Sequence, residues 1–271
     1  MKKILIIASL ILTQISFCQK TPLNNLLKIE YNEFRIFTPS IINLDLGTLI
    51  VSNDYSFYSS KVIKKIKKEK IEDGESIGVN DIKEMLSEII IDRKKKILTE
   101  KLFDNLILKK KYAVYEGLPK MKWKLSNEKK KIGNYECKKA TTEFRGRKYD
   151  AWYTEKIPVS LGPWKFNGLP GVILFVEDKE GLYKWEAKLI SYPYINSKGK
   201  KDNINSKITD DPKFEKISFE EYDKKRIKKI KEKVEIIKSR NSGRDFNVRF
   251  EYTTEQEKEP VNEFRETKVF K

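Results

Sequence analysis

Residues 162–178, which read GPWKFNGLPGVILFVED, constrain the fold of this chain more than any other stretch. Proline fixes φ and glycine accepts φ values that other residues avoid, so two turns are expected here. In the second turn, Pro170 suits the second position of a type II turn and Gly171 the third, where φ is positive. Residues 172–176 then form an apolar, β-branched run, which is typical of a strand covered on both faces. The residues expected to shape this structural motif are Gly162, Pro163, Gly168, Leu169, Pro170 and Gly171.

Alternation of apolar and polar residues predicts more strands around this motif. Residues 61–70 carry apolar side chains at helical spacing, which favours a short helix between polar loops at 53–60 and 71–80. Residues 81–110 fit either strands or an amphipathic helix, and we favour two or three strands. The remaining predicted strands are 27–37, 41–51, 182–190 and 246–252, with a hairpin at 133–154 whose turn is 144–147.

A long helix is predicted over residues 219–239. Ser218 and Glu221 have the spacing of a capping box at its start. Its apolar side chains recur at helical spacing and predict an amphipathic helix. Packing against the sheet is favoured over a position on a membrane surface. The residues of the expected apolar stripe are Ile227, Ile230, Val234 and Ile237.

The first residues have the form of a secretory signal peptide. Lys2 and Lys3 precede a short apolar run, and small residues precede a cleavage point before Gln19. The apolar run is shorter than the roughly 20 residues that a membrane span needs. We therefore expect a signal peptide at 1–18, one β-rich domain at 19–252 and a charged tail at 253–271. The mature protein should be exported, soluble and free of membrane insertion, in the periplasm or outside the cell.

The charge of +17 raises the question of nucleic acid. Only nine of the 57 basic residues are Arg, whereas Arg dominates phosphate and base recognition. The Lys runs are more simply solvated surfaces. A nucleic-acid partner is not expected.

The absence of histidine excludes most familiar catalytic and metal sites. Ser-His-Asp and Cys-His arrangements need it, as do the common zinc, copper and iron sites. The chain has neither a P-loop nor a GxGxxG motif, so we expect no cofactor and no metal. Carboxylate pairs remain as a possible chemistry, with Asp150, Glu155, Glu177 and Asp178 near the motif. Cys137, the cysteine left after signal cleavage, is expected to be a small buried side chain.

Aromatic residues crowd into the 34 residues 152–185 around the motif, and six of them are candidates for a ligand site. Such residues build cores, and they also build platforms for sugars or peptides. If they lie on an open face of the sheet, that face would be a binding surface. The predicted ligand-binding residues are Trp152, Tyr153, Trp164, Phe166, Tyr183 and Trp185.

The run from 133 to 174 resembles the GLPGLI family, small exported proteins of the Bacteroidetes. The name motif reads GLPGVI at 168–173, with Val172 in place of the usual Leu. Gly162-Pro163, the AWYT block at 151–154 and the YxC element at 135–137 also resemble the family pattern. This resemblance implies a fold similar to the bowl-like N-terminal domain of a bacterial peptide-N-glycosidase, with an antiparallel sheet curved around a concave face. It implies no catalytic residues.

These observations predict a mainly antiparallel β fold of the α+β type, either a curved sheet or a half-barrel, with one long amphipathic helix near the C-terminal end. The expected function is that of a non-enzymatic binding or accessory protein of the bacterial envelope. Its concave face, edged by the motif, would bind a peptide, a glycan or an envelope protein. The alternatives are a carboxylate-dependent envelope hydrolase and a carrier of lipid or lipoprotein. The oligomeric state is left open.

Overall fold

A computed structural model describes residues 26–38, 41–71, 74–103, 108, 110–194 and 211–241. They form one twelve-stranded sheet in the order β12-β6-β5-β4-β3-β2-β1-β11-β10-β9-β8-β7. Neighbouring strands pair antiparallel, except that β12 runs parallel to β6. The strands are β1 (Leu26–Thr38), β2 (Ile41–Val51), β3 (Tyr55–Ile71), β4 (Gly74–Asp92), β5 (Ile97–Leu102), β6 (Tyr112–Gly117), β7 (Lys124–Ile132), β8 (Tyr135–Phe144), β9 (Arg147–Thr154), β10 (Val172–Asp178), β11 (Tyr183–Tyr194) and β12 (Glu215–Ser218).

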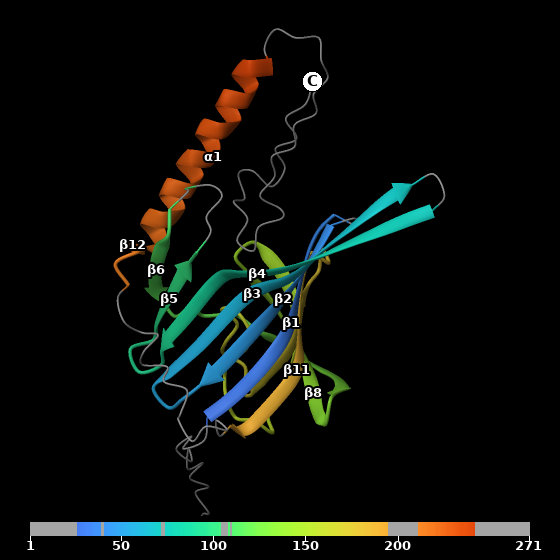
Figure 1. Ribbon diagram of the computed structural model, residues 1–271. Coiled ribbons are helices and arrows are strands. Elements are labelled where there is room, and N and C mark those ends of the chain that lie inside the picture. The colour runs from blue at the N-terminus through green and yellow to red at the C-terminus, as the bar shows by residue number, and fades with distance from the viewer. Residues whose placement is uncertain are drawn as a thin grey trace, which may run out of the picture.

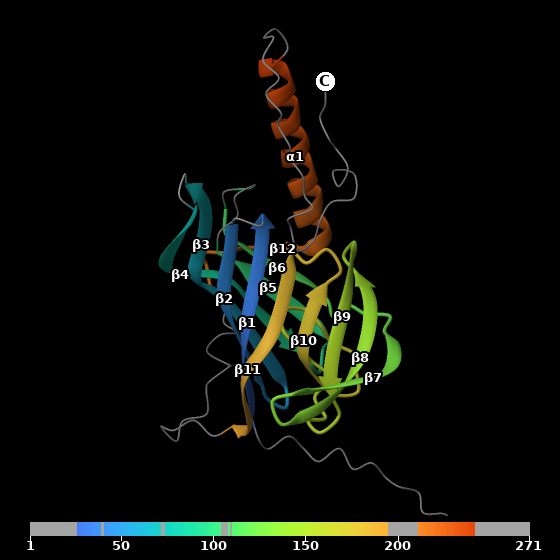
Figure 2. The same ribbon diagram turned by 90° about the vertical axis from the view of Figure 1, so that its right-hand side faces the viewer.

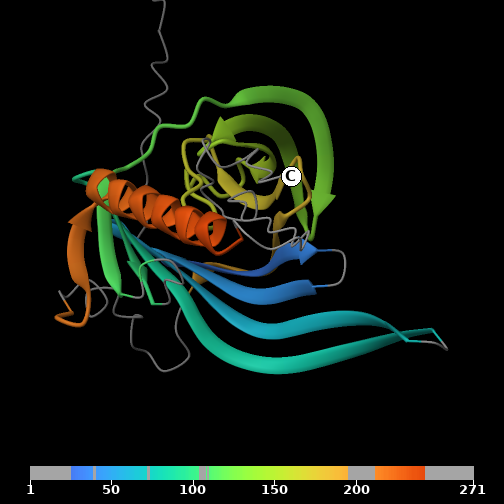
Figure 3. The ribbon, with the colours of Figure 1, turned by 90° about the horizontal axis from the view of Figure 1, so that it is seen from above.

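The sheet is strongly curved but not closed. Seen from above, β1 to β4 form one side and the strands that follow 117 arch over the other (Figure 3). Seen from the side, β5, β6 and β12 lie behind β1, β11 and β10 (Figure 2). The predicted class is therefore confirmed in its main terms: mostly antiparallel β, one large curved sheet, and a single helix near the C-terminal end among the described residues.

Residues 155–171 fill the hollow of the curve, and we call the face of the sheet that they contact the inner face. Ile157, Val159 and Leu161 are buried in one cluster with side chains from β1 to β5, including Ile29 and Leu49. Successive strand residues point to opposite faces, so the alternation in β1 and β2 places one set on the inner face and the other outside. The hydrophobic core therefore lies between the sheet and its own connecting segment.

The helix predicted over 61–70 is wrong. The loops predicted over 53–60 and 71–80 are wrong from Tyr55 and from Gly74 onward. β3 runs from Tyr55 to Ile71 and pairs along its length with β2 and β4. A β-bulge between Val62 and Lys64 interrupts its alternation. A bulge adds one residue to one strand and so breaks the period of two, which makes the local spacing resemble that of a helix.

The other strand predictions are confirmed where the structure describes them. Within 81–110, residues 81–92 belong to β4 and residues 97–102 form β5, so the described part is stranded, as favoured, rather than helical. The hairpin at 133–154 is β8 and β9, and the strand at 172–176 is β10. The strand predicted over 246–252, the signal peptide at 1–18 and the tail at 253–271 lie outside the described residues.

Helix α1 spans Phe219–Asn241 (Figure 1). Its capping box is present, since the Glu221 backbone N–H donates to Ser218 Oγ at 3.2 Å and the Ser218 N–H donates to Glu221 Oε2 at 3.4 Å. Among its described side chains, Tyr222, Arg226 and Ile230 are buried, at the i, i+4 and i+8 positions of one face. Of the predicted stripe, Ile230 is buried and Ile227 half-buried, while the side chains of Val234 and Ile237 lie outside the described part of the structure. None of the described helices is long and apolar enough to span a membrane.

Candidate functional site

The motif forms a small loop that closes on itself. The Gly162 N–H donates to the Phe166 carbonyl at 2.8 Å, and Ser160 Oγ donates to the Leu169 carbonyl at 2.6 Å. Gly168 has a φ of +94°, a value that L side chains rarely adopt. These bonds force the side chains of the loop toward the sheet, into the hollow of the curve.

Gly171 serves a different purpose from the one predicted. It is not among the glycines with positive φ, so the expected type II geometry is wrong at this position. A Cβ on Gly171 would lie 2.1 Å from the Thr154 carbonyl oxygen. The chain enters β10 pressed against the end of β9, and only glycine permits this approach.

Five of the six predicted ligand-binding aromatics lie in the core. Trp164 and Trp185 stack with their planes 5° apart, and Phe166 meets the edge of Trp185 at 5.4 Å between ring centroids. The other side of Trp185 stacks on Tyr183 at 5.9 Å. Tyr153 belongs to the same buried cluster. The exposed platform expected at these five positions is therefore wrong, because the rings fill the hollow that a ligand would enter.

Trp152 is the exception among the six. Its neighbours Ala151 and Tyr153 are buried on the inner face, so Trp152 points to the outer one. It is half-buried there and lies beside Phe175, its register partner on β10. Sequence alternation could have separated Trp152 from Tyr153. Its role in binding stays a prediction.

A fully buried lysine joins the motif to the far end of the sheet. Lys165 is 1% exposed, and its Nζ lies 2.9 Å from Glu100 Oε2 and 3.3 Å from Glu116 Oε1. Arg145, in the β8–β9 turn, also pairs with Glu116. The Arg145 guanidinium lies 3.8 Å from the centroid of the Phe219 ring. This network connects β5 and β6 with the β8–β9 turn and the start of α1, so it holds the curve together.

A second buried polar cluster, missed from the sequence, lies on β1, β2 and β3. Glu33 is fully buried and accepts hydrogen bonds from Tyr58 Oη at 3.0 Å and Ser60 Oγ at 2.8 Å. Asp45, opposite Glu33 in the sheet, is also fully buried and binds Arg35 through both carboxylate oxygens. Glu33 falls at the same parity in β1 as the inward Tyr31. The alternation of inward and outward residues along β1 could therefore have predicted from the sequence that Glu33 points inward.

Burial has a clear effect on the tyrosine in this cluster. Desolvation raises the pKa of Tyr58 well above its usual value, and the negative charge of Glu33 raises it further. Tyr58 therefore stays protonated and donates to Glu33 at any physiological pH. The cluster is a structural unit with its donors and acceptors matched.

Two of the four carboxylates near the motif, Asp150 and Glu177, are cross-strand partners on β9 and β10. Asp178 lies on the inner side, where it binds the buried Arg147 at 2.9 Å and accepts two backbone N–H groups. Desolvation raises the pKa of Asp178, against the opposing effect of these donors. Asp150 points the other way and pairs with Lys179 at 2.6 Å, while Glu155 pairs with Lys138. Asp150 is buried and paired with Lys179 and Lys139, and the exposed Glu177 lies beside it on the same face. A general acid and base instead flank the bond that they act on.

The outer face carries a band of lysine and aromatic side chains, which we call the lysine–aromatic strip: Lys130, Lys139, Trp152 and Phe175. Lys130 Nζ lies 3.8 Å from the centroid of the Phe175 ring and 4.5 Å from that of Trp152. Lys139 Nζ lies 5.9 Å from Trp152. Both distances to Lys130 are typical of a cation–π contact. Partial desolvation lowers the pKa of Lys130.

Cys137 lies under this strip, opposite Lys130 in the β7–β8 pair. It is fully buried, and desolvation raises the pKa of its thiol to about 11. The expected structural role is therefore consistent with its position, since a thiol with this pKa is unreactive at neutral pH. The described residues hold no group of three Cys, Asp or Glu side chains that could bind a metal ion.

Comparison with known proteins gives a fold but no activity. A family model described as "Protein of unknown function (Porph_ging)" matches residues 143–175, from the end of β8 through the motif to β10. No curated protein matches the chain. The solved chain described as "Structure of PNGF-II in C2 space group" is similar with a TM-score of 0.50 and 19% identity, over 76% of this chain and 33% of that one. A second, "Structure of PNGF-II in P21 space group", has a TM-score of 0.47 and 18% identity, over 76% and 34%.

The chain thus spans about a third of the length of the solved chains it matches. At this level of identity the likeness shows the curved fold alone. It carries no residue role and no activity to this chain.

Proposed function

We propose that this protein is an exported, non-enzymatic binding or accessory module of the bacterial envelope, of the GLPGLI type. Its ligand surface is the lysine–aromatic strip on the outer face of the sheet, rather than the concave face. The ligand is a peptide or a glycan that presents an apolar ring or chain together with an acidic group.

The observation that carries this proposal is the contrast in exposure among the aromatics. Trp152 and Phe175 keep part of their rings accessible beside Lys130. Rings of this kind bury much apolar area at low entropic cost, and an ammonium group adds selectivity for an acid. A neutral sugar face or an apolar side chain would contact the rings. A carboxylate would contact Lys130, since Lys139 already pairs with Glu128 and Asp150.

The two alternatives have less support from the side chains. A hydrolase would need an accessible carboxylate pair, but of the neighbours Asp150 and Glu177 the first is buried and paired with Lys179 and Lys139. A lipid carrier would need an empty apolar hollow, and residues 155–171 occupy the hollow with Trp164 and Phe166. The binding role needs neither.

Two finer points belong to the same proposal. The GLPGVI sequence at 168–173 is the basis for the GLPGLI name, and the N-terminal run at 1–18 is the basis for export. An amphipathic α1 is supported by Ile230, which is buried, and by Lys228 and Lys229, which are exposed.

The test is retention of ligands from the cell envelope on the immobilised protein, with mass spectrometry for peptides and glycan arrays for sugars. We expect the double variant Trp152→Ser, Lys130→Ser to lose the retained species by at least about tenfold. Tyr115→Ser is the matched control, because Tyr115 is an exposed aromatic on β6 at the other end of the sheet. Equal retention by the double variant and the wild type, or equal loss in the control, would sink the proposal.

A further inference from the structure

Four side chains on neighbouring positions of β9 and β10 form a block on the outer face of the sheet. Trp152 is the register partner of Phe175, and Asp150 is the register partner of Glu177. Residues two apart in a strand point to the same face, so two aromatic rings lie directly beside two carboxylates. Trp152 and Phe175 are half-buried, and Glu177 is exposed. The block therefore combines an apolar surface with an accessible hydrogen-bond acceptor.

Most charges beside this block are paired with a neighbour. The carboxylate of Asp150 lies 2.6 Å from Lys179 Nζ and 3.4 Å from Lys139 Nζ. Glu186 of β11, on the same outer face, lies 3.7 Å from Lys184 Nζ. Because these acids and bases neutralise each other, they select neither an anion nor a cation.

Lys130 and Glu177 differ from these groups. Within the part of the chain that the structure describes, neither lies at ion-pair distance from an opposite charge. The Lys130 ammonium lies 3.8 Å from the centroid of the Phe175 ring. Desolvation lowers the pKa of Lys130, and the negative charge of Glu177 opposes this effect. One cation and one anion without ion-pair partners therefore border the same pair of rings.

We propose that this block binds a uronic acid residue of a glycan. The proposal rests on the proposed ligand role of the lysine–aromatic strip and names the ligand class. The C–H face of the sugar ring packs on Trp152 and Phe175. The ammonium of Lys130 donates to the sugar carboxylate, and hydroxyls on the other side of the sugar ring donate to Glu177.

Glu177 favours a glycan over an acidic peptide. The ionised side chain of an acidic peptide has no donor for a second carboxylate, so Glu177 repels it. A sugar presents neighbouring hydroxyls, each of which can donate to Glu177. A neutral sugar would leave Lys130 partly desolvated without a counter-charge, and this disfavours it. A uronic acid satisfies both charges at once.

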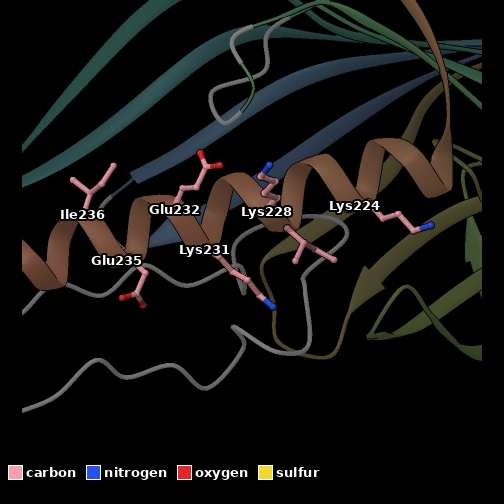
Figure 4. A pocket seen from close by; sticks show the side chains of 7 residues that line it. Lys224, Lys228, Lys231, Glu232, Glu235 and Ile236 are labelled. Carbon is pink, nitrogen blue, oxygen red and sulfur yellow. The ribbon is translucent and has the colours of Figure 1, made fainter.

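The shallow groove along α1 lacks this combination of groups. Among the described residues that line it, Lys224, Lys228 and Lys231 are mixed with Glu232 and Glu235, and none is aromatic (Figure 4). It provides no stacking surface for a sugar ring. We therefore place the glycan on the outer face of β9 and β10.

The experiment measures binding of soluble probes to the exported, processed protein by fluorescence anisotropy. The probes are oligosaccharides of galacturonate and of glucuronate, the same oligosaccharides after reduction of their carboxyl groups, and polyglutamate. We expect at least one oligouronate to bind at least about tenfold more tightly than its reduced form, because the reduced form loses a charge-assisted hydrogen bond. It should exceed polyglutamate by a similar factor, since polyglutamate has no sugar ring to stack.

Three single variants test the roles of the side chains. Lys130→Gln and Trp152→Ser should each weaken binding of the oligouronate by at least about tenfold. Glu177→Gln should weaken it by about three- to tenfold, because an amide oxygen is a weaker acceptor than a carboxylate. Circular dichroism checks that each variant keeps the fold.

The matched controls are Lys129→Gln and Glu136→Gln. These two exposed residues pair with each other at 3.1 Å and lie on the opposite face of β7 and β8 from Lys130. Each control changes the same charge as one test variant, and each should alter oligouronate binding by less than about twofold. An equal loss in the controls would indicate a diffuse effect of net charge and would overturn the proposal.

The remaining outcomes separate this proposal from the proposed function. No binding of either oligouronate, or equal binding of the reduced probes, would overturn the uronate assignment. If polyglutamate binds as tightly and Glu177→Gln has no effect, the ligand is an acidic peptide, so the uronate assignment fails while the binding role of the strip stands. If oligouronate binds but Lys130→Gln and Trp152→Ser leave its affinity unchanged, the strip is not the site and both proposals fail.

Discussion

Lys165 and Lys130 both lie beside aromatic rings, and their surroundings differ. Lys165 is 1% exposed and has two glutamates within 3.3 Å. Lys130 is half-buried over Phe175 and Trp152, and within the described part of the chain no carboxylate lies at ion-pair distance from it. A buried charge with its counter-charges is a structural tie, whereas a partly desolvated charge without one can bind an external acid. Lys165 therefore stabilises the fold, whereas Lys130 is available to bind a ligand.

The largest effect is expected at the buried lysine. Lys165→Met leaves Glu100 and Glu116 buried with one cation fewer, and breaking such a network costs about 3–5 kcal/mol. Urea unfolding followed by tryptophan fluorescence measures the loss. Lys130→Met is the matched control, because it removes the half-buried lysine of the strip. It should lower the free energy of unfolding by less than about 1 kcal/mol. Similar losses of stability in the two variants would contradict the distinction between a structural lysine and a ligand-binding lysine.

The close approach at the entry to β10 gives the next largest effect. Gly171→Ala places a methyl group 2.1 Å from the Thr154 carbonyl oxygen, so the backbone must shift, at a cost of roughly 1–3 kcal/mol. Gly117→Ala is the matched control, because nothing lies within 4 Å of a Cβ there. An unchanged stability in Gly171→Ala would show that the motif loop is not pressed against β9.

The polar cluster on β1 to β3 predicts a dependence on alkaline pH. The folded state raises the pKa of Tyr58, so its contribution to stability is complete below the unfolded pKa of about 10 and is lost as the pH rises through the folded pKa. Tyr58→Phe should therefore flatten the fall in unfolding free energy above pH 10. It should also lower stability by about 1–3 kcal/mol at neutral pH, because Glu33 loses a buried donor. A wild-type profile that is flat above pH 10 would contradict the assignment.

The smallest effect concerns Cys137, beneath the strip. With a pKa of about 11 and no exposure, its thiol should react with a thiol reagent at pH 8 at least about a hundredfold more slowly in the folded protein than in urea. Absorbance of the released chromophore measures both rates. Comparable reaction rates in the folded and the urea-unfolded protein would mean that the lysine–aromatic strip does not shield Cys137 from the reagent.

The sequence predicts the strands well wherever alternation is unbroken, as in β1, β2 and β9. It fails in β3, because a bulge shifts the alternation and lysines with interspersed Val and Ile then match helical spacing. Pairing with β2 and β4 makes this segment a strand, and the local sequence does not show which distant strands will pair with it.

The candidate site is harder to predict, because which face of a strand is covered depends on a distant segment. Trp152 and Tyr153 are adjacent and equally aromatic, yet the loop at 155–171 covers only the side of Tyr153. Lys165 has the composition of a surface residue, and only the folded loop shows that Glu100 and Glu116 receive it. The capping box of α1, by contrast, depends on Ser218 and Glu221, which are three residues apart, and it was predictable from the sequence.

The most direct test of the contrast between a filled inner side and an available outer strip is oxidative footprinting of the individual tryptophans, with each site followed by mass spectrometry. We predict that Trp152 is oxidised at least about tenfold faster than Trp164 and Trp185, whose rings are stacked in the core. Equal rates at Trp152 and Trp185 would contradict the account, because the hollow of the sheet would then be open to solvent.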